Sequence, residues 1–233
     1  MKLKDKVAVI TGGGRGIGKA IAQAYAREGA QLALCARTSD ELDQTVKELQ
    51  AMNANARGWM CDVSIEEPVK EFIADVHKQF GRIDVLVNNA GVMTRPTPIG
   101  EIDVKKWDYT IAVNLRGPFL LSRAVVPIMM KQNSGAIINV SSMIGRGAYA
   151  NFLAYATSKW GLEGFTQTLA AEVRSANIRV NSVEPGYVAT KLTGFRGSKP
   201  ESVTDLFVHL ASDEAKNTTG QMLSSSGWKS QVK

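Results

Sequence analysis

The chain has 233 residues, of which 44% are hydrophobic, and this suits one α/β domain with a sizeable core. Its 28 Lys and Arg residues against 22 Asp and Glu residues leave a net charge of +6, but the basic residues are scattered, which argues against a nucleic-acid partner. The sequence has no N-terminal apolar segment and no unbroken apolar run of about 18 residues, so we expect a cytoplasmic protein without a membrane partner.

Strand-like and helical segments alternate along the whole chain. The apolar segments predicted as strands are residues 7–11, 32–36, 57–61, 85–88, 136–141, 179–184 and 222–223. The segments with helical periodicity are residues 17–28, 39–52, 66–79, 104–131, 152–175 and 201–212. This order predicts an α/β fold, a doubly wound parallel sheet of about seven strands with helices on both faces (Rossmann fold). We expect residues 1–233 to form a single domain that binds ligands at the carboxyl ends of its strands.

The segment TGGGRGIGKA, residues 11–20, resembles two different phosphate-binding loops. The spacing of Gly13, Gly18 and Lys19 approaches that of a P-loop, but a P-loop needs a Mg²⁺-binding hydroxyl where this chain has Ala20. A strand-to-helix turn favours a dinucleotide loop, although a tight turn without a ligand would use the same glycines. The dinucleotide interpretation assigns cofactor contacts to Gly12, Gly14, Arg15, Gly16, Ile17 and Gly18.

The turn after the second predicted strand is Ala36-Arg37-Thr38, and it lacks the carboxylate that usually binds the adenosine ribose hydroxyls of NAD. Arg37, together with Arg15 and Thr38, suits a 2′-phosphate, whose oxygens accept charge-assisted hydrogen bonds. We therefore expect NADP(H) as the cofactor. An ordinary exposed arginine at position 37 would look the same in the sequence.

The ends of the next two predicted strands also carry candidate cofactor contacts. Asp62, followed by Val63, can accept a hydrogen bond from an adenine amino group, or it can cap the helix that begins near Ile65. In the segment NNAG at residues 88–91, small side chains would let a cofactor lie against the backbone, but a turn uses the same residues. The contacts assigned there are Asn89, Ala90 and Gly91.

Tyr155 and Lys159 lie four residues apart in a strongly helical segment, so a phenol and an ammonium group share one helix face. A tyrosine has a pKa of about 10, and a nearby cation favours its phenolate, which makes it a usable acid or base near neutral pH. Alone, such a pair is usually an exposed helix pair. Here the preceding strand ends in Ser141 and Ser142, and Ser142 can donate to the same substrate oxygen that Tyr155 protonates.

Taken together and in order, these motifs resemble those of the short-chain dehydrogenase/reductase family, of the ordinary-length, single-domain kind. The matching segments are TGGGRGIG at 11–18, CDV at 61–63, NNAG at 88–91, Asn114, YATSK at 155–159 and PGYVAT at 185–190. Ser142 precedes Tyr155 by 13 residues (155 − 142), the family spacing, so Ser142 rather than Ser141 takes the catalytic position. The family spacing also favours the dinucleotide interpretation of the glycine loop.

The resemblance implies a role for each matching residue. Tyr155 would be the proton donor and acceptor, Lys159 would hold the nicotinamide ribose and lower the pKa of Tyr155, and Ser142 would orient the carbonyl. Asn114 would hold a water molecule of a proton relay. Tyr155 and Lys159 are also counted as cofactor contacts, with Pro185, Gly186, Val188 and Thr190.

Asn114 has a second, independent peculiarity, because Pro118 follows it by four residues within a predicted helix. Proline has no N–H group, so the carbonyl of residue 114 loses its helical partner and the helix should kink there. That carbonyl would then be available to a water molecule. A kink required only for packing would leave the same sequence.

The segment KLTGFRGSKPES, residues 191–202, is short for the helical substrate lid that the family usually carries. Its glycines and Pro200 argue against a regular helix. We therefore expect a shortened lid around residues 190–202 and an open substrate pocket. The C-terminal MLSSSG at 222–227 also departs from the strand and Asp-Gly-Gly that often end the family's chains.

Cysteines and histidines are scarce. Cys35 and Cys61 each end an apolar run, which indicates buried thiols in a reducing compartment rather than a disulfide framework. His77 and His209 lie far apart without neighbouring cysteine or carboxylate clusters, so we expect no metal site and no hydrolytic triad.

The sequence therefore predicts an NADP(H)-dependent oxidoreductase that interconverts a carbonyl and an alcohol in a small-molecule substrate. One alternative is a 3-oxoacyl thioester reductase of the acyl-carrier-protein type, with Arg95, Arg146 and Lys191 as surface cations for an acidic carrier. Another is a catalytically idle nucleotide-binding regulatory module. The resemblance also implies a homo-oligomer, a tetramer or a dimer, formed through helices 104–131 and 152–175.

Overall fold

A parallel sheet of seven strands organises the structure, a computed structural model that describes residues 1–232. The strands are β1 (Val7–Thr11), β2 (Gln31–Ala36), β3 (Ala56–Met60), β4 (Val85–Asn88), β5 (Gly135–Val140), β6 (Ile178–Glu184) and β7 (Met222–Ser224). Their order in the sheet is β3-β2-β1-β4-β5-β6-β7, and all neighbouring strands run parallel. The predicted doubly wound sheet is thus confirmed.

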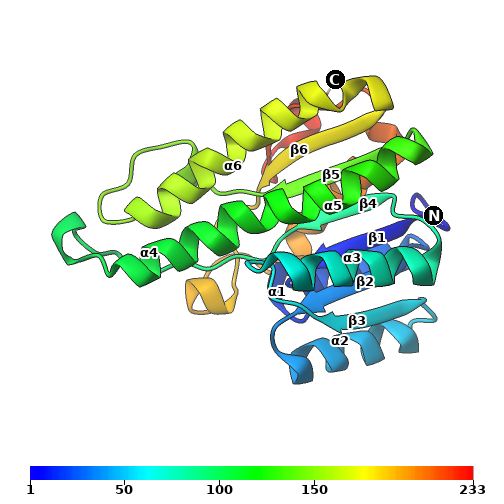
Figure 1. Cartoon of the computed structure of the whole chain (residues 1–233), viewed down its shortest axis with the longest axis horizontal. Coiled ribbons are helices and arrows are strands. Elements are labelled where there is room, and N and C mark those ends of the chain that lie inside the picture. Colours follow the sequence, from blue (N-terminus) through cyan, green and yellow to red (C-terminus); the bar gives the residue numbers. More distant parts are fainter. Residues whose placement is uncertain (233) are drawn as a thin grey trace.

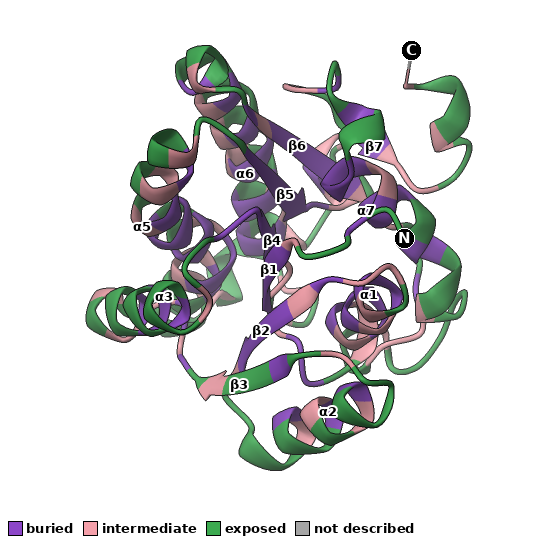
Figure 2. Cartoon of the chain, turned by 90° about the vertical axis from the view of Figure 1, so that its right-hand side faces the viewer, coloured by how far each residue is buried: buried purple, intermediate pink, exposed green. Residues whose placement is uncertain are grey.

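Helices cover both faces of this sheet (Figure 2). They are α1 (Gly16–Arg27), α2 (Ser39–Ala51), α3 (Glu66–Phe80), α4 (Val104–Ile111), α5 (Gly117–Gln132), α6 (Leu153–Glu172) and α7 (Thr204–Ala211). One face packs against α1, α2 and α7, and the other against α3, α5 and α6. Because the central strands are covered on both sides, most of their side chains are apolar, as in the fully buried VAVIT of β1.

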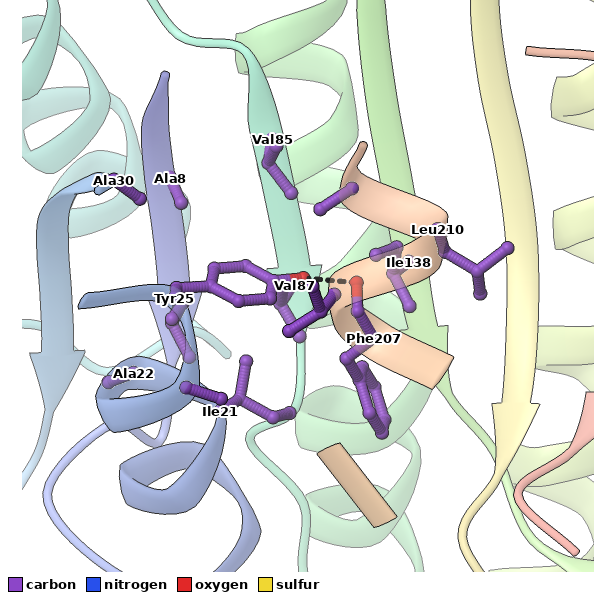
Figure 3. Close-up of a cluster of buried hydrophobic side chains, with 14 of the residues drawn as sticks. Ala8, Ile21, Ala22, Tyr25, Ala30, Val85, Val87, Ile138, Phe207 and Leu210 are labelled. Atoms are coloured by element: carbon purple, nitrogen blue, oxygen red, sulfur yellow. Dashed lines mark hydrogen bonds between the residues drawn. The ribbon is translucent and has the colours of Figure 1, made fainter. Parts of the chain in front are cut away.

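Figure 3 shows the core on the α1 and α7 side of the sheet. Side chains of one sheet face, including Ala8 and Ile138, meet Ile21 of α1. Tyr25 of α1 is fully buried, and its hydroxyl donates a hydrogen bond to the Phe207 carbonyl of α7 at 2.9 Å. This bond satisfies the polar end of a large side chain in an otherwise apolar layer and joins two helices that are far apart in the sequence.

The long helix predicted over residues 104–131 is interrupted near the position of the expected kink. α4 ends at Ile111, a π-helical turn follows over Ala112–Arg116, and α5 begins at Gly117 with Pro118 in its first turn. Proline is tolerated in a first helical turn, because its missing N–H group has no helical acceptor there. The disturbance therefore takes the form of a wide turn that carries Asn114.

The stretch Val104–Gln132 is also the one part of the described chain that could cross a membrane by length and composition, with a mean hydropathy of 1.2. Core helices of water-soluble proteins have similar lengths and compositions, and 44% of the most apolar part of this stretch is buried inside the protein. The stretch packs against α3 and α6, which accounts for its apolar side chains.

Candidate active site

A cavity of about 580 Å³ lies at the carboxyl ends of the strands, where doubly wound sheets bind ligands. Its wall includes three of the four predicted catalytic residues, namely Ser142, Tyr155 and Lys159. It also includes every predicted cofactor residue except Gly18. Nearly all the residues predicted from the sequence therefore lie on one surface, although they come from seven segments of the chain.

Close backbone packing explains the glycines of the loop between β1 and α1. Gly12 and Gly16 have φ angles of +66° and +54°, in the left-handed region that favours glycine. A Cβ atom at Gly18 would come within 2.3 Å of the Gly12 carbonyl oxygen, so Gly18 lets the helix approach the loop instead of lining the cavity. The loop itself reaches the cavity wall through Gly12, Gly14 and Gly16.

Thr11 and Asn89 join this loop to the end of β4. The Thr11 hydroxyl accepts hydrogen bonds from the backbone N–H groups of Asn89 and Ala90 at 3.0 and 2.9 Å. The Asn89 amide in turn donates to the Thr11 carbonyl at 2.8 Å. These hydrogen bonds hold the glycine loop and the end of β4 together on one side of the cavity. Thr11 was not singled out in the sequence, although its position directly before the glycines was a usable signal.

Near the turn after β2, both predicted arginines already have partners. The Nη1 atom of Arg15 lies 2.7 and 2.9 Å from the two carboxylate oxygens of Glu41. Arg37 lies over the ring of Tyr109, with its guanidinium carbon 5.5 Å from the ring centre. Glu41 lines the cavity and was not predicted as a site residue. The T-x-x-E pattern from Thr38 suggests a capping box, but Thr38 makes no side-chain cap, and Glu41 pairs with Arg15 instead.

For Asp62, the sequence left two interpretations open, a contact to adenine and a cap of the following helix. It lines the cavity, and its Oδ1 atom accepts hydrogen bonds from the Ser64 backbone N–H and hydroxyl at 2.9 and 2.7 Å. The cap position of α3 is Ile65, which has no side-chain cap. Asp62 therefore shapes the turn before α3 without capping the helix.

Three of the four predicted catalytic side chains come from the end of β5 and from α6, which both line the cavity. Ser142 follows β5, and its hydroxyl accepts a hydrogen bond from the Ile144 N–H at 3.2 Å. Tyr155 and Lys159 belong to α6, and the Lys159 ammonium lies 5.6 Å from the Tyr155 ring centre. That ammonium donates to the Val140 carbonyl, the last residue of β5, at 2.7 Å. Lys159 thereby ties α6 to the strand that carries Ser142.

Burial is the largest cause of the pKa shifts of Tyr155 and Lys159. Burial raises the pKa of Tyr155 above its ordinary value, while its hydrogen bond with Ser142 lowers the pKa to a smaller extent. The resemblance implied that Lys159 lowers the Tyr155 pKa, and the structure departs from that expectation. The physical reason is that a phenolate here would lose its hydration, while the Lys159 ammonium points to the Val140 carbonyl. Tyr155 is consequently protonated at neutral pH.

Lys159 is only 5% exposed, and burial lowers its pKa to about 8. The carboxylate of Glu163, one helical turn further along α6, opposes this shift. Glu163 is itself buried and accepts hydrogen bonds from the Ser182 hydroxyl and from Nε of Arg146, the latter at 3.3 Å. Sequence reasoning missed Glu163, although its position four residues after Lys159 placed it on the same helix face.

Arg146 does not occupy the surface role considered in the sequence. Its guanidinium is directed to the buried Glu163 and to the Leu223 carbonyl of β7, at 3.4 Å for the latter. The other two proposed carrier-binding cations, Arg95 and Lys191, are exposed. The reason for the difference is the buried carboxylate, which would be costly without a cationic partner.

Asn114 lies beside the cavity without lining it. Its side-chain oxygen accepts a hydrogen bond from the Val92 N–H, and its amide nitrogen donates to the Val92 carbonyl, both at 2.8 Å. The amide nitrogen also lies 3.1 Å from the Ser158 hydroxyl. The side chain thus holds the segment after the NNAG motif, and both of its polar atoms already have protein partners.

With the cavity described, comparison with known proteins shows the family. A family model described as short chain dehydrogenase matches residues 6–201, most of the chain. The chain belongs to the short-chain dehydrogenase/reductase family. Family membership makes the protein an oxidoreductase with a nicotinamide cofactor, NAD or NADP.

Similar members of the short-chain dehydrogenase/reductase family carry different names. The chain is 38% identical to a 3-oxoacyl-(acyl-carrier-protein) reductase, FabG, of Thermotoga maritima, over 97% of this chain and 98% of that protein. It is 36% identical to a D-threitol dehydrogenase of Mycolicibacterium smegmatis, over 94% and 90%. The structure of NAD⁺-bound xylitol dehydrogenase matches with a TM-score of 0.91 and 28% identity, over 96% and 98%. Membership therefore specifies oxidoreduction and not the substrate.

We expect the buried Lys159 to make folding stability depend on alkaline pH. Unfolded lysine titrates at 10.5 and folded Lys159 at about 8, so between these values the unfolded chain holds a proton that the folded chain has released. Stability then rises with pH. Relative to Lys159→Met, the free energy of unfolding of the unmodified protein should increase by about 2 kcal/mol from about pH 8 to about pH 10.

Urea unfolding of both proteins across this pH range measures the effect. Other groups titrate in both proteins and cancel in the difference. A difference that stays constant with pH would show that Lys159 keeps its ordinary pKa.

Proposed function

We propose that this protein is an NADP(H)-dependent oxidoreductase that interconverts a carbonyl and an alcohol by hydride transfer, with Tyr155 as general acid and base. The observation that carries the proposal is the convergence of Ser142, Tyr155 and Lys159 on the same cavity as the glycine loop. The bound cofactor would supply or accept the hydride. We assign the catalytic roles to these three side chains and to Asn114.

The glycine-loop end of the cavity fits a dinucleotide. Gly12 and Gly16 keep side chains out of the loop, and the loop leads directly into the N-terminus of α1. The first turn of α1 contains no acidic residue, so no negative charge on it opposes the binding of a pyrophosphate by its backbone N–H groups.

In the reducing direction, the Tyr155 hydroxyl would donate its proton to the substrate carbonyl oxygen. The raised pKa of Tyr155 supports this role, because it keeps the phenol protonated at neutral pH. Ser142 would donate a hydrogen bond to the same oxygen. Lys159 would hold ribose hydroxyls, and its pKa of about 8 makes it able to return a proton toward Tyr155.

Preference for NADP(H) is supported by the charges at the other end of the cavity. Arg15, Arg37 and Thr38 line it together, and position 36, where an NAD site usually has a carboxylate nearby, is an alanine. Two guanidinium groups within one wall suit the doubly charged 2′-phosphate.

We propose an open substrate pocket beneath a shortened lid at residues 190–202. This segment contains the 3₁₀ turn Lys191–Thr193, and a second 3₁₀ turn, Pro200–Val203, begins at its end. A β-bridge between Val188 and Ser198 closes the loop that carries the first turn. Such a lid encloses less substrate than a pair of helices, which favours broad specificity. The buried thiols Cys35 and Cys61 support a reducing, cytoplasmic location.

A screen of NADPH oxidation against ketones, aldehydes, sugars and acyl thioesters tests this function. The similarity to a 3-oxoacyl-(acyl-carrier-protein) reductase makes acyl thioesters the specific alternative class. Turnover confined to 3-oxoacyl thioesters would favour that alternative. Cofactor binding without turnover of any class would favour the idle regulatory module.

We also propose a homo-oligomer, a tetramer or a dimer, formed through the α4–α5 stretch and α6. These helices lie side by side on one face of the molecule (Figure 1). Their exposed large apolar side chains are Val104, Tyr109, Phe119, Met130, Leu153 and Trp160. Burial of such side chains between two copies would favour association.

Tyr155→Phe should lower turnover with NADPH by about 100-fold or more, because it removes the proton donor and little else. Binding of NADPH should be nearly unchanged, which fluorescence titration can measure. Tyr187→Phe is the matched control, since it deletes a phenol hydroxyl from the wall of the same cavity. Equal losses in the two variants would argue against Tyr155 as the acid.

Arg37→Asp should shift preference from NADP(H) toward NAD(H), because it places a carboxylate where the 2′-phosphate would bind. The ratio of kcat/KM for the two cofactors measures this shift. Arg57→Asp, on the exposed edge of β3, is the control for the change in net charge. An unmodified protein that uses NADH better than NADPH would contradict the proposed preference.

Phe119→Asp should weaken self-association, because Phe119 is 45% exposed on α5 and would face the partner copy. Sedimentation at micromolar concentration should show an oligomer for the unmodified protein and a smaller species for the variant. Met52→Asp introduces the same charge at an exposed apolar position beyond α2 and should leave the oligomer intact. A monomeric unmodified protein would refute the assembly.

A further inference from the structure

Glu41 brings a negative charge into the part of the cavity that the proposed function assigns to the 2′-phosphate. Both of its carboxylate oxygens lie within 3 Å of Nη1 of Arg15, at 2.7 and 2.9 Å. The two side chains are partly exposed, 48% for Arg15 and 38% for Glu41, so water and a ligand can reach the pair. Both residues line the cavity together with Arg37 and Thr38.

The backbone holds Glu41 in this position. The Thr45 hydroxyl donates to the Gly14 carbonyl of the glycine loop at 2.9 Å and lies 3.0 Å from the Glu41 carbonyl. A Cβ atom at Gly14 would come within about 3.1 Å of the Leu42 backbone nitrogen. The glycine loop therefore lies directly on the first turn of α2, and this packing places Arg15 next to Glu41.

This arrangement makes Glu41 and a 2′-phosphate competitors for one guanidinium group. A phosphate that binds Arg15 must displace the carboxylate or remain beside it, and a like charge nearby weakens its binding. A ribose 2′-hydroxyl meets no such penalty, because a hydroxyl can donate a hydrogen bond to a carboxylate. The same side chain therefore opposes one cofactor and accepts the other.

We propose that Glu41 is a cofactor-specificity residue that lowers affinity for the 2′-phosphate and lets the cavity accept NAD(H) as well as NADP(H). The inference rests on the proposed nucleotide site. It concerns a residue that does not belong to the glycine loop or to the turn after β2. It also gives α2 a part in cofactor choice through its first turn.

The test compares Glu41→Gln with the unmodified protein, using calorimetric binding of adenosine 2′,5′-bisphosphate and adenosine 5′-monophosphate. These two fragments differ only in the 2′-phosphate and require no turnover. Glu41→Gln keeps the side-chain size and removes the charge. Affinity for the bisphosphate should rise about 10-fold, as expected for a charge-assisted contact that is no longer contested, and affinity for the monophosphate should change less than about 2-fold.

Asp40→Asn is the matched control. Asp40 precedes Glu41 in the same helical turn, is exposed and does not line the cavity. Asp40→Asn removes the same charge from the same helix end. If only Glu41→Gln changes the binding of the bisphosphate, the effect cannot come from net charge alone. The selective gain should also shrink as salt is raised, because the contact is partly exposed.

Three results would overturn the proposal: equal tightening of both fragments, no change in either, or weaker binding of the bisphosphate. The last would show that Glu41 aligns Arg15 for the phosphate instead of competing with it. If the unmodified protein binds neither fragment, both the proposed nucleotide site and the role of Glu41 are refuted. If it binds the monophosphate more tightly, only the NADP(H) preference fails, and the change on Glu41→Gln still decides the role of Glu41.

Discussion

Close backbone contact at the β1–α1 loop is the constraint on which the rest of the cavity depends. The space between the Gly12 carbonyl and Gly18 is too small for any Cβ atom, and the side chain of Asn89 fills the remaining gap. Through this contact α1 lies against the end of β1, and the end of β4 is held at the same level by Thr11. Hydrogen bonds of the Thr11 and Asn89 side chains therefore hold these backbone segments together. Larger residues there would separate the helix from the sheet.

Burial sets the chemistry of the opposite wall. The same loss of hydration that raises the pKa of Tyr155 lowers that of Lys159, because each shift favours the neutral form of its group. Glu163 limits the effect on Lys159, and Arg146 with Ser182 compensates the buried carboxylate. Polar contacts thus run from Glu163 to Ser182 of β6, and through Arg146 to the Leu223 carbonyl of β7. The buried Glu163 carboxylate depends on these partners, since an unpaired charge in this place would be destabilising.

At the end of the cavity that contains Arg37, the charged groups are partly exposed to water. Under the proposed function, the balance between Arg15, Arg37 and Glu41 would distinguish a phosphate from a hydroxyl. Exposure makes these interactions weaker and dependent on salt, but it also lets them rearrange around a ligand. One end of the site is thus built from buried groups, and the other from groups that water can reach.

The sequence by itself determined the fold class and the position of most site residues. Alternating apolar strands and amphipathic helices can form only a few layered arrangements, and the ends of parallel strands meet at one edge. The i, i+4 spacing of Tyr155 and Lys159 was sufficient to place them on one helix face. The tertiary structure decided what depends on contacts between distant segments or on collective burial. Glu41 and Arg15 are 26 residues apart, and Arg146 and Glu163 are 17 apart, so no local pattern pairs them. The direction of the Tyr155 shift likewise reflects the dehydration of the whole wall, which no short motif encodes.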